Sequence, residues 1–207
     1  MTQIFRIHPD NPQQRLVAKA VAILRAGGII VYPTDSCYAL GCRIGDKDAL
    51  ERIRRIRHLD ERHNLTLMCR DLSELAIYAK VGNSAFRLMK SLTPGPYTFL
   101  LAATRDVPRR LQHPKRKTIG VRVPDNIVAL ALLTAMSEPL LSTSLILSGE
   151  SMPLTDPTVI NERVGRQVDL VMDGGVSGLE PTTVIDLAEG QPVIIRQGKG
   201  RAPAIGG

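Results

Sequence analysis

The chain has 207 residues, of which 43% are hydrophobic and 3% aromatic, and it carries a net charge of +7 with a pI of about 9.7. This length can bury a sizeable core in one domain, or two at most, and three cysteines without a Cys-x-x-Cys pair argue against a disulfide framework. The opening residues lack the pattern of a signal peptide, and the longest apolar run falls short of the roughly 20 residues of a membrane helix. We therefore expect a soluble, cytoplasmic protein that contacts no membrane.

The positive charge is concentrated in the first part of the chain. Residues 1–125 contain 22 Lys and Arg against 11 Asp and Glu, whereas residues 126–207 contain 5 against 9. Such an uneven distribution predicts an anionic partner, either a nucleotide or the phosphate backbone of RNA. Because aromatic residues are scarce and Trp is absent, a single-strand reader built on stacked bases is disfavoured. Recognition of duplex RNA by its shape and phosphates stays open.

Hydrophobic periodicity and capping signals place helices and strands along the whole chain. The expected helices run from Asn11 to Gly27, from Asp46 to about residue 58, at Ser73–Ala79, at Ser84–Leu92, at about 127–136, and onward from Asp156. The expected strands are 29–32, Leu65–Met68, Tyr97–Ala103, Thr118–Val123, Leu140–Ser144, Val168–Met172, Thr182–Asp186 and Val193–Arg196. Asn11, Asp46, Asn83 and Asn126 are the predicted N-caps or helix starts.

The order of these elements predicts the fold class. Helices and strands alternate unevenly, and several strands late in the chain follow one another directly, which favours a mixed α/β sheet over a purely parallel one. No repeat or linker divides the chain, so residues 1–207 are expected to form a single domain with a flexible Gly/Pro-rich tail at 197–207. The chain has neither a P-loop nor a Rossmann glycine fingerprint.

Four clusters share one pattern, in which a strand ends and hydroxyl groups or a cation follow. They are Thr34-Asp35-Ser36, Arg122, Ser142-Thr143-Ser144 and Arg196. Ligands of α/β sheets bind beyond the strand ends, and converging hydroxyls and arginines would suit a ligand with a carboxylate and phosphates.

Each cluster also has a purely structural interpretation. Hydroxyl and carboxylate residues after a proline are common in turns, and an arginine at a strand end is often a solvated charge or a surface ion pair. The arginines of helix 46–58 could simply form its solvated face. Cys37, Cys42 and Cys69 could ligate a metal with His58, His63 or His113, but we interpret them as small buried hydrophobes and expect no metal site.

Runs across most of the chain resemble the YrdC-like domain of threonylcarbamoyl-AMP synthases, and most closely its YciO subgroup. The matching runs are Gly27–Asp35, Tyr38–Gly41, Thr93–Thr98, Gly120–Pro124, Leu141–Ser144, Leu147–Gly149, Asp173–Gly175, Pro181–Asp186 and Ile195–Gly198. The resemblance implies a twisted open α/β sheet with a large, positively charged cavity. It also implies the family reaction, in which threonine, bicarbonate and ATP with Mg²⁺ give threonylcarbamoyl-adenylate and pyrophosphate for tRNA modification.

The resemblance assigns roles to individual residues. Thr34, Arg122 and Thr182 would hold the threonine side of the ligand, whereas Arg57, Ser142, Ser144 and Arg196 would lie along the nucleotide and its phosphates. Family members are also described as binding double-stranded RNA, as tRNA or rRNA. The residues expected to contact it are Arg54, Arg55, Lys115, Arg116 and Lys117.

Two departures from the synthase pattern bear on activity. The Lys-x-Arg pair of the synthases reads Arg57-His58-Leu59 here, and their Ser-x-Asn reads Ser144-Leu145-Ile146. Each departure removes a polar group, and removing one preorganised donor typically costs about 10²–10³ in rate. Arg54, Arg62 or His63 could reach the same space.

The catalytic residues therefore remain unassigned, and three hypotheses stay open. The first is a YrdC-like protein that binds RNA, an ATP- or adenylate-type ligand, or both, without efficient synthase turnover. The second is an active synthase, a nucleotidyltransferase with a rearranged phosphate clamp. The third is an enzyme that hydrolyses an adenylate or nucleotide in the cavity. The oligomeric state is not predicted.

Overall fold

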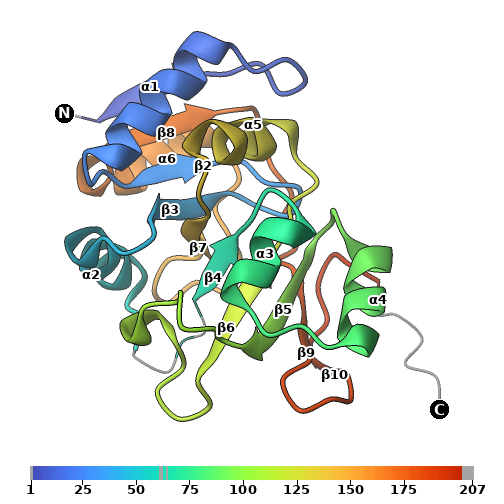
Figure 1. The fold of residues 1–207 in the computed structure, drawn as a ribbon. Coiled ribbons are helices and arrows are strands. Elements are labelled where there is room, and N and C mark those ends of the chain that lie inside the picture. Colours follow the sequence, from blue (N-terminus) through green and yellow to red (C-terminus); the bar gives the residue numbers. More distant parts are fainter. Residues whose placement is uncertain (1, 61–62, 64, 202–207) are drawn as a thin grey trace.

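One mixed sheet dominates the molecule (Figure 1). The computed structural model describes residues 2–60, 63 and 65–201, and in this part of the chain the strands follow the order β1-β8-β2-β3-β7-β4-β6-β5-β9-β10. Their bounds are β1 Gln3–Arg6, β2 Ile30–Tyr32, β3 Ala39–Arg43, β4 Thr66–Met68, β5 Tyr97–Ala102, β6 Thr118–Arg122, β7 Leu140–Ser144, β8 Leu170–Asp173, β9 Thr183–Asp186 and β10 Val193–Arg196. Five neighbouring pairs are antiparallel and four are parallel, which confirms the mixed α/β fold.

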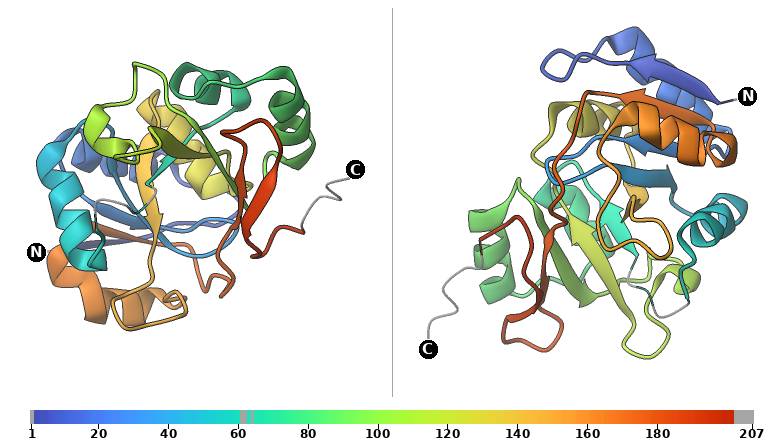
Figure 2. Two further views of the ribbon diagram at one scale, coloured as in Figure 1. Left: turned by 90° about the horizontal axis from the view of Figure 1, so that it is seen from below. Right: turned by 180° about the vertical axis from the view of Figure 1, so that it is seen from behind.

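Helices cover both faces of this sheet. They are α1 Gln14–Arg25, α2 Lys47–Arg57, α3 Leu72–Tyr78, α4 Asn83–Leu92, α5 Ile127–Met136 and α6 Pro157–Val164, with 3₁₀ turns at Arg109–Leu111 and Gly165–Gln167. The apolar faces of α1 and α5 pack together over β2 and β8 in one buried cluster. The apolar faces of α2 and α6 belong to a second cluster, and the view from behind shows α6 on the side of the sheet opposite α1 and α5 (Figure 2).

Side-chain caps fix where several helices begin. Asp46 accepts a hydrogen bond from the amide of Ala49 at 2.9 Å, and Asn126 accepts one from the amide of Ala129 at 3.0 Å. Both caps were predicted, and each satisfies an amide that the helix itself leaves unpaired.

Two predicted helix starts were wrong. Asn11 does not cap α1, because its amide and that of Asp10 donate to Nδ1 of His8, which holds residues 8–11 in a turn. Asn83 is the first residue of α4, whose N-cap is Gly82 and makes no side-chain bond. At Asn11 the imidazole of His8 takes up the backbone amides, and the sequence alone does not show that contact.

Two strands were not predicted at all. β1 is a short edge strand with mostly exposed side chains, so no apolar pattern marks it. β3 pairs antiparallel with β2. Its central Gly41 is a residue type more typical of loops than of strands, so the sequence did not indicate a strand here. The glycine is required, because a Cβ at this position would lie 2.7 Å from Cε1 of Tyr32.

The first residues of the predicted tail lie against the sheet. Gly198 donates its amide to Oγ1 of Thr183 at 2.9 Å, and the hydroxyl of Tyr97 donates to the carbonyl of Arg201 at 3.0 Å. Residues 202–207 lie outside the described residues. Within the described ranges, no helix is long and apolar enough to cross a membrane.

Candidate functional site

A cavity of about 510 Å³ opens on the sheet where β2 leads into β3, where β6, β7 and β10 end, and where β9 begins. It contains every residue that the resemblance assigned to the small-molecule ligand. Its lining is Thr34, Ser36, Cys37, Ala39, Arg57, His63, Thr66, Met68, Thr98, Leu100, Arg122, Ser142, Thr143, Ser144, Ile146, Thr182, Val184, Ile195 and Arg196. The lining comes from segments far apart in the chain because the strand order places β3, β7, β4 and β6 side by side.

Small residues hollow the floor of the cavity. Thr66 of β4 pairs with Ser142 of β7 on one side and with Gly120 of β6 on the other. A Cβ at Gly120 would lie 2.9 Å from Oγ1 of Thr66, so this strand comes as close as it does only because the residue is glycine.

Thr34 serves both as a turn residue and as part of the cavity wall. Its hydroxyl donates to the carbonyl of Cys37 at 2.7 Å and accepts from the amides of Ser36 and Cys37 at 3.2 and 3.3 Å. These bonds close the turn between β2 and β3. Thr34 is therefore both a turn residue and a cavity residue, as the two interpretations of its cluster proposed. Most of the hydrogen bonds that its hydroxyl can form are made inside the turn.

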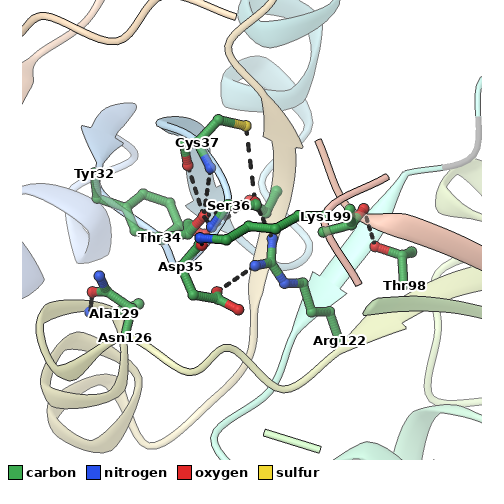
Figure 3. A network of polar contacts seen from close by, with 12 residues as sticks. Tyr32, Thr34, Asp35, Ser36, Cys37, Thr98, Arg122, Asn126, Ala129 and Lys199 are labelled. Atoms are coloured by element: carbon green, nitrogen blue, oxygen red, sulfur yellow. Dashed lines mark hydrogen bonds and ion pairs between the residues drawn. The ribbon is translucent and has the colours of Figure 1, made fainter. Parts of the chain in front are cut away.

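Arg122 is held by two side chains of that same turn (Figure 3). The arginine is 4% exposed, donates to Oγ of Ser36 at 3.1 Å and forms an ion pair with Asp35. Nε of Arg122 and Oδ2 of Asp35 are buried and have no hydrogen-bond partner among the described residues. Asp35 belongs to the predicted cluster Thr34-Asp35-Ser36, but the sequence assigned it no role of its own. It compensates the charge that Arg122 would otherwise present to a ligand.

Arg196 is oriented by Thr182, the residue that precedes β9. Its guanidinium donates to the carbonyl of Thr182 at 2.9 and 3.1 Å and to Oγ1 of Thr182 at 3.3 Å. Oγ1 of Thr182 is in turn 2.9 Å from Oγ1 of Thr98. Burial lowers the pKa of Arg196, as expected for a cation that lacks a carboxylate partner.

Arg57 and His63 form the other cationic part of the wall. Arg57 is the last residue of α2, and its buried Nε has no partner among the described residues. Burial lowers the pKa of Arg57. Loss of hydration lowers the pKa of His63, and the charges of Arg57 and Arg196 lower it further, while Asp60 opposes them. Arg57 and Arg196 thus both disfavour a proton on His63, and a bound anion would offset the charges of the two arginines.

The two predicted serines differ in what they can offer a ligand. Ser142 Oγ lies 2.8 Å from the hydroxyl of Tyr32 and 3.3 Å from the carbonyl of Leu40, so it is occupied in the sheet. Burial raises the pKa of Tyr32 to about 12. Ser144 is half-buried in the wall, and within the described residues its hydroxyl forms no hydrogen bond that a ligand would have to replace.

The two positions that depart from the synthases lie in different places. Ile146 lines the cavity and places an apolar side chain there. Leu59 packs against the core cluster and borders a surface hollow beside α2. Of the proposed replacement cations, Arg54 is bound to Glu51 and to the carbonyl of Arg110, His63 does line the cavity, and Arg62 lies outside the described residues.

Within the described residues, neither the cysteines nor the cavity wall gathers the three side chains that a protein-bound metal ion needs. Cys37, Cys42 and Cys69 are free and buried, and no cluster of three His, Cys, Asp or Glu occurs in the described part of the chain. The described lining contains no carboxylate. Because protein-bound Mg²⁺ usually takes one or two carboxylates, these residues do not fit a magnesium ion held by the protein.

The five residues predicted for RNA lie on α2 and on the loop before β6, which the Arg54–Arg110 hydrogen bond joins at 3.2 Å. Arg54 and Arg116 are ion-paired with Glu51 and Asp186 at 2.9 and 2.6 Å. Arg55, Lys115 and Lys117 are exposed and, within the described ranges, form no salt bridge.

Comparison with known proteins assigns the family. The model of the Sua5/yciO/yrdC family, described as "Telomere recombination", matches residues 22–198. The chain belongs to this family. It is 62% identical to "Uncharacterized protein YciO" of Escherichia coli K12, with 97% of each chain covered, and the crystal structure of E. coli YciO superposes with a TM-score of 0.95 over 97% of each chain.

Two more distant members of the Sua5/yciO/yrdC family carry a function in their names. The threonylcarbamoyl-AMP synthase of Chromobacterium violaceum is 34% identical, with 88% of this chain and 94% of the synthase covered. The crystal structure of Pyrococcus abyssi Sua5 in complex with L-threonine is 28% identical, with a TM-score of 0.87 over 95% of this chain and 58% of Sua5. These matches confirm the family and the fold that the sequence motifs implied.

Proposed function

We propose that the cavity binds an anionic ligand of the ATP or adenylate type. The observation that carries this proposal is the charge of the wall, which has three arginines and no carboxylate among its described residues. Asp35 pairs with Arg122, whereas no carboxylate of the described residues forms a salt bridge with Arg57 or Arg196. A phosphate would supply the acceptor that Nε of Arg57 lacks.

We further propose that synthase turnover is inefficient. Phosphoryl transfer depends on donors positioned for the charge that develops in the transition state. Ile146 occupies the cavity where the synthases carry an amide, and Leu59 is turned to the core instead of the cavity. Arg57 and Ser144 can still bind phosphate, so we expect ligand binding to survive better than turnover.

One assay tests both proposals. The purified protein is incubated with threonine, bicarbonate, ATP and Mg²⁺, pyrophosphate and threonylcarbamoyl-adenylate are measured, and the affinity for ATP is determined by calorimetry. We expect measurable ATP binding with little product, and a gain of product in Ile146→Asn, alone or with Leu59→Arg. The matched control Ile146→Val keeps the wall apolar and should gain nothing.

An active synthase is the alternative, and the similarity to named threonylcarbamoyl-AMP synthases favours it. Robust product formation by the unaltered protein would establish this alternative and refute inefficient turnover. Release of AMP or inorganic phosphate from ATP without threonine would instead indicate the hydrolase.

Binding of double-stranded RNA, as tRNA or rRNA, is a second candidate function. It rests on the contiguity of α2 with the loop before β6. Exposed lysines and arginines release counterions when they bind phosphate, so affinity should fall steeply with salt. Because Arg54 and Arg116 are ion-paired, we expect Arg55, Lys115 and Lys117 to carry most of this affinity.

The RNA test compares a triple variant with a control of equal charge. Changing Arg55, Lys115 and Lys117 together to Gln should weaken binding of a duplex RNA and make it less sensitive to salt. The control changes three exposed cations on other surfaces to Gln, namely Arg15, Lys19 and Lys90. Equal losses of RNA affinity in the two variants would contradict this interface. They would mean that the RNA binds another face or that only the net charge of the protein matters.

A further inference from the structure

The turn that follows β10 is firmly attached beside the cavity. The amide of Lys199 donates to the carbonyl of Pro181 at 2.9 Å, and Gln197 Nε2 donates to the carbonyl of Gly200 at 2.6 Å. A Cβ at position 198 would lie 2.2 Å from the carbonyl oxygen of Pro181, so only glycine allows this approach. The position of the Lys199 backbone is therefore fixed by contacts that do not involve its side chain.

The side chain of Lys199 reaches back over the ion pair of the site. Figure 3 shows it extended past Arg122 towards the turn, where its ammonium donates to the backbone carbonyl of Asp35 (Figure 3). Lys199 is exposed, and within the described residues it makes no salt bridge. Lys199 is not part of the cavity lining, but since Arg122 and Asp35 neutralise each other, it adds a net positive charge next to Arg122, at the edge of the cavity.

We infer that Lys199 is a ligand-binding residue, which exchanges the carbonyl of Asp35 for an anionic group of the ligand. This inference rests on the proposed binding of an anionic ligand. It adds a second place at which a cation of the protein binds an anionic group of that ligand. Arg57 and Arg196 hold one anionic group, and Lys199 beside Arg122 holds another. The preferred ligand therefore carries two separated anionic groups, such as a phosphate and a carboxylate.

The hydrogen-bond chemistry favours this exchange. A backbone carbonyl is a neutral acceptor, and a charge-assisted hydrogen bond to a carboxylate or phosphate is roughly twice as strong. The ammonium group needs only side-chain rotation to move, because the backbone of the turn is held independently. Lysine suits this role, since its ammonium is a compact charge on a flexible stem.

The test measures the affinities of ATP and of L-threonine by calorimetry for the unaltered protein and for Lys199→Met. We expect the affinity for at least one probe to fall about tenfold in the variant, and the affected probe tells whether the anionic group is a phosphate or a carboxylate. Lys199→Arg should retain most of the affinity. The matched control Lys19→Met removes an equal charge from the exposed side of α1 and should change neither affinity.

The salt dependence of binding separates direct contact from a structural role. If Lys199 contacts the ligand, Lys199→Met should make the affinity less sensitive to salt at an unchanged thermal midpoint. An equal salt dependence in the two proteins, or unchanged affinity for both probes, would overturn the inference while leaving the proposed function intact. If the unaltered protein binds neither probe, both proposals fail together.

Discussion

At the scale of single residues, the site is defined by which charges are compensated. Arg122 has a carboxylate partner in Asp35, whereas Arg57 and Arg196 have none among the described residues. A ligand anion therefore gains most at Arg57 and Arg196, where it need not compete with a carboxylate of the described residues. Asp35 keeps Arg122 in place and limits what it can bind.

Changing Asp35 tests this division. Asp35→Asn leaves the buried charge of Arg122 uncompensated, and breaking a buried ion pair costs about 3–5 kcal/mol. We expect the free energy of unfolding, measured with urea, to fall by about 3 kcal/mol, because Asn can still accept one hydrogen bond. Asp10→Asn, at an exposed turn, is the control and should have little effect. A loss in Asp35→Asn no larger than in this control would show that Arg122 is solvated.

At the scale of helices and strands, the sequence predicted those elements whose hydrophobic periodicity and capping residues are local. α5 and β7 were predicted within a residue or so because an uninterrupted apolar pattern and the Asn126 cap mark them. β3 and the start of α1 were missed because contacts with Tyr32 and His8 decide them. The same limit applies to the site.

The residues predicted to contact a small-molecule ligand line one cavity, but the pairing of their charges was not foreseen. The strand-end pattern and the family motifs brought Thr34, Arg122 and Arg196 into one cavity. They could not reveal that Asp35 neutralises Arg122 or that Lys199 returns to the same turn, because these contacts join residues 87 and 164 positions apart. Sequence spacing carries no information about such pairs.

The close approach of β6 to β4 at Gly120 leads to a prediction at the scale of strands. Gly120→Ala would push a methyl group against Thr66 and the carbonyl of Leu65, each 2.9 Å away. Overpacking of this kind costs about 1–3 kcal/mol, and we expect a lower free energy of unfolding together with weaker ATP binding. Gly82→Ala is the matched control, because nothing lies within 4 Å of its added Cβ and φ is −79°. Equal effects of the two changes would argue against the close approach.

At the scale of the whole molecule, the burial of two tyrosines and a cysteine makes the stability of the fold decrease at alkaline pH. Burial raises the pKa of Tyr32 and of Tyr38 from 10.0 to about 12, and burial raises that of Cys42 from 9.0 to about 12. The folded state keeps protons that the unfolded chain releases, so these groups contribute their full stability below about pH 9 and lose it as the pH rises towards 12.

We therefore expect the urea midpoint, followed by circular dichroism, to fall progressively between about pH 9 and pH 11.5, within this range of pKa values. Tyr32→Phe removes one of the responsible groups and should make the decline shallower, although the variant also loses its bond to Ser142. A midpoint that stays constant over this range would mean that the tyrosines ionise in the folded state.

The strand order also determines when, during synthesis, the sheet and the cavity can form. β1 and β2 are separated by β8, so the first strands of the chain wait for residues 170–173 before they can join one sheet, and such long-range pairing is slow. Arg196, which lines the cavity, and Lys199 come later still. A chain that ended before residue 196 would lack both cations. The proposed ligand would therefore bind such a chain more weakly than the finished molecule and, by mass action, stabilise it less.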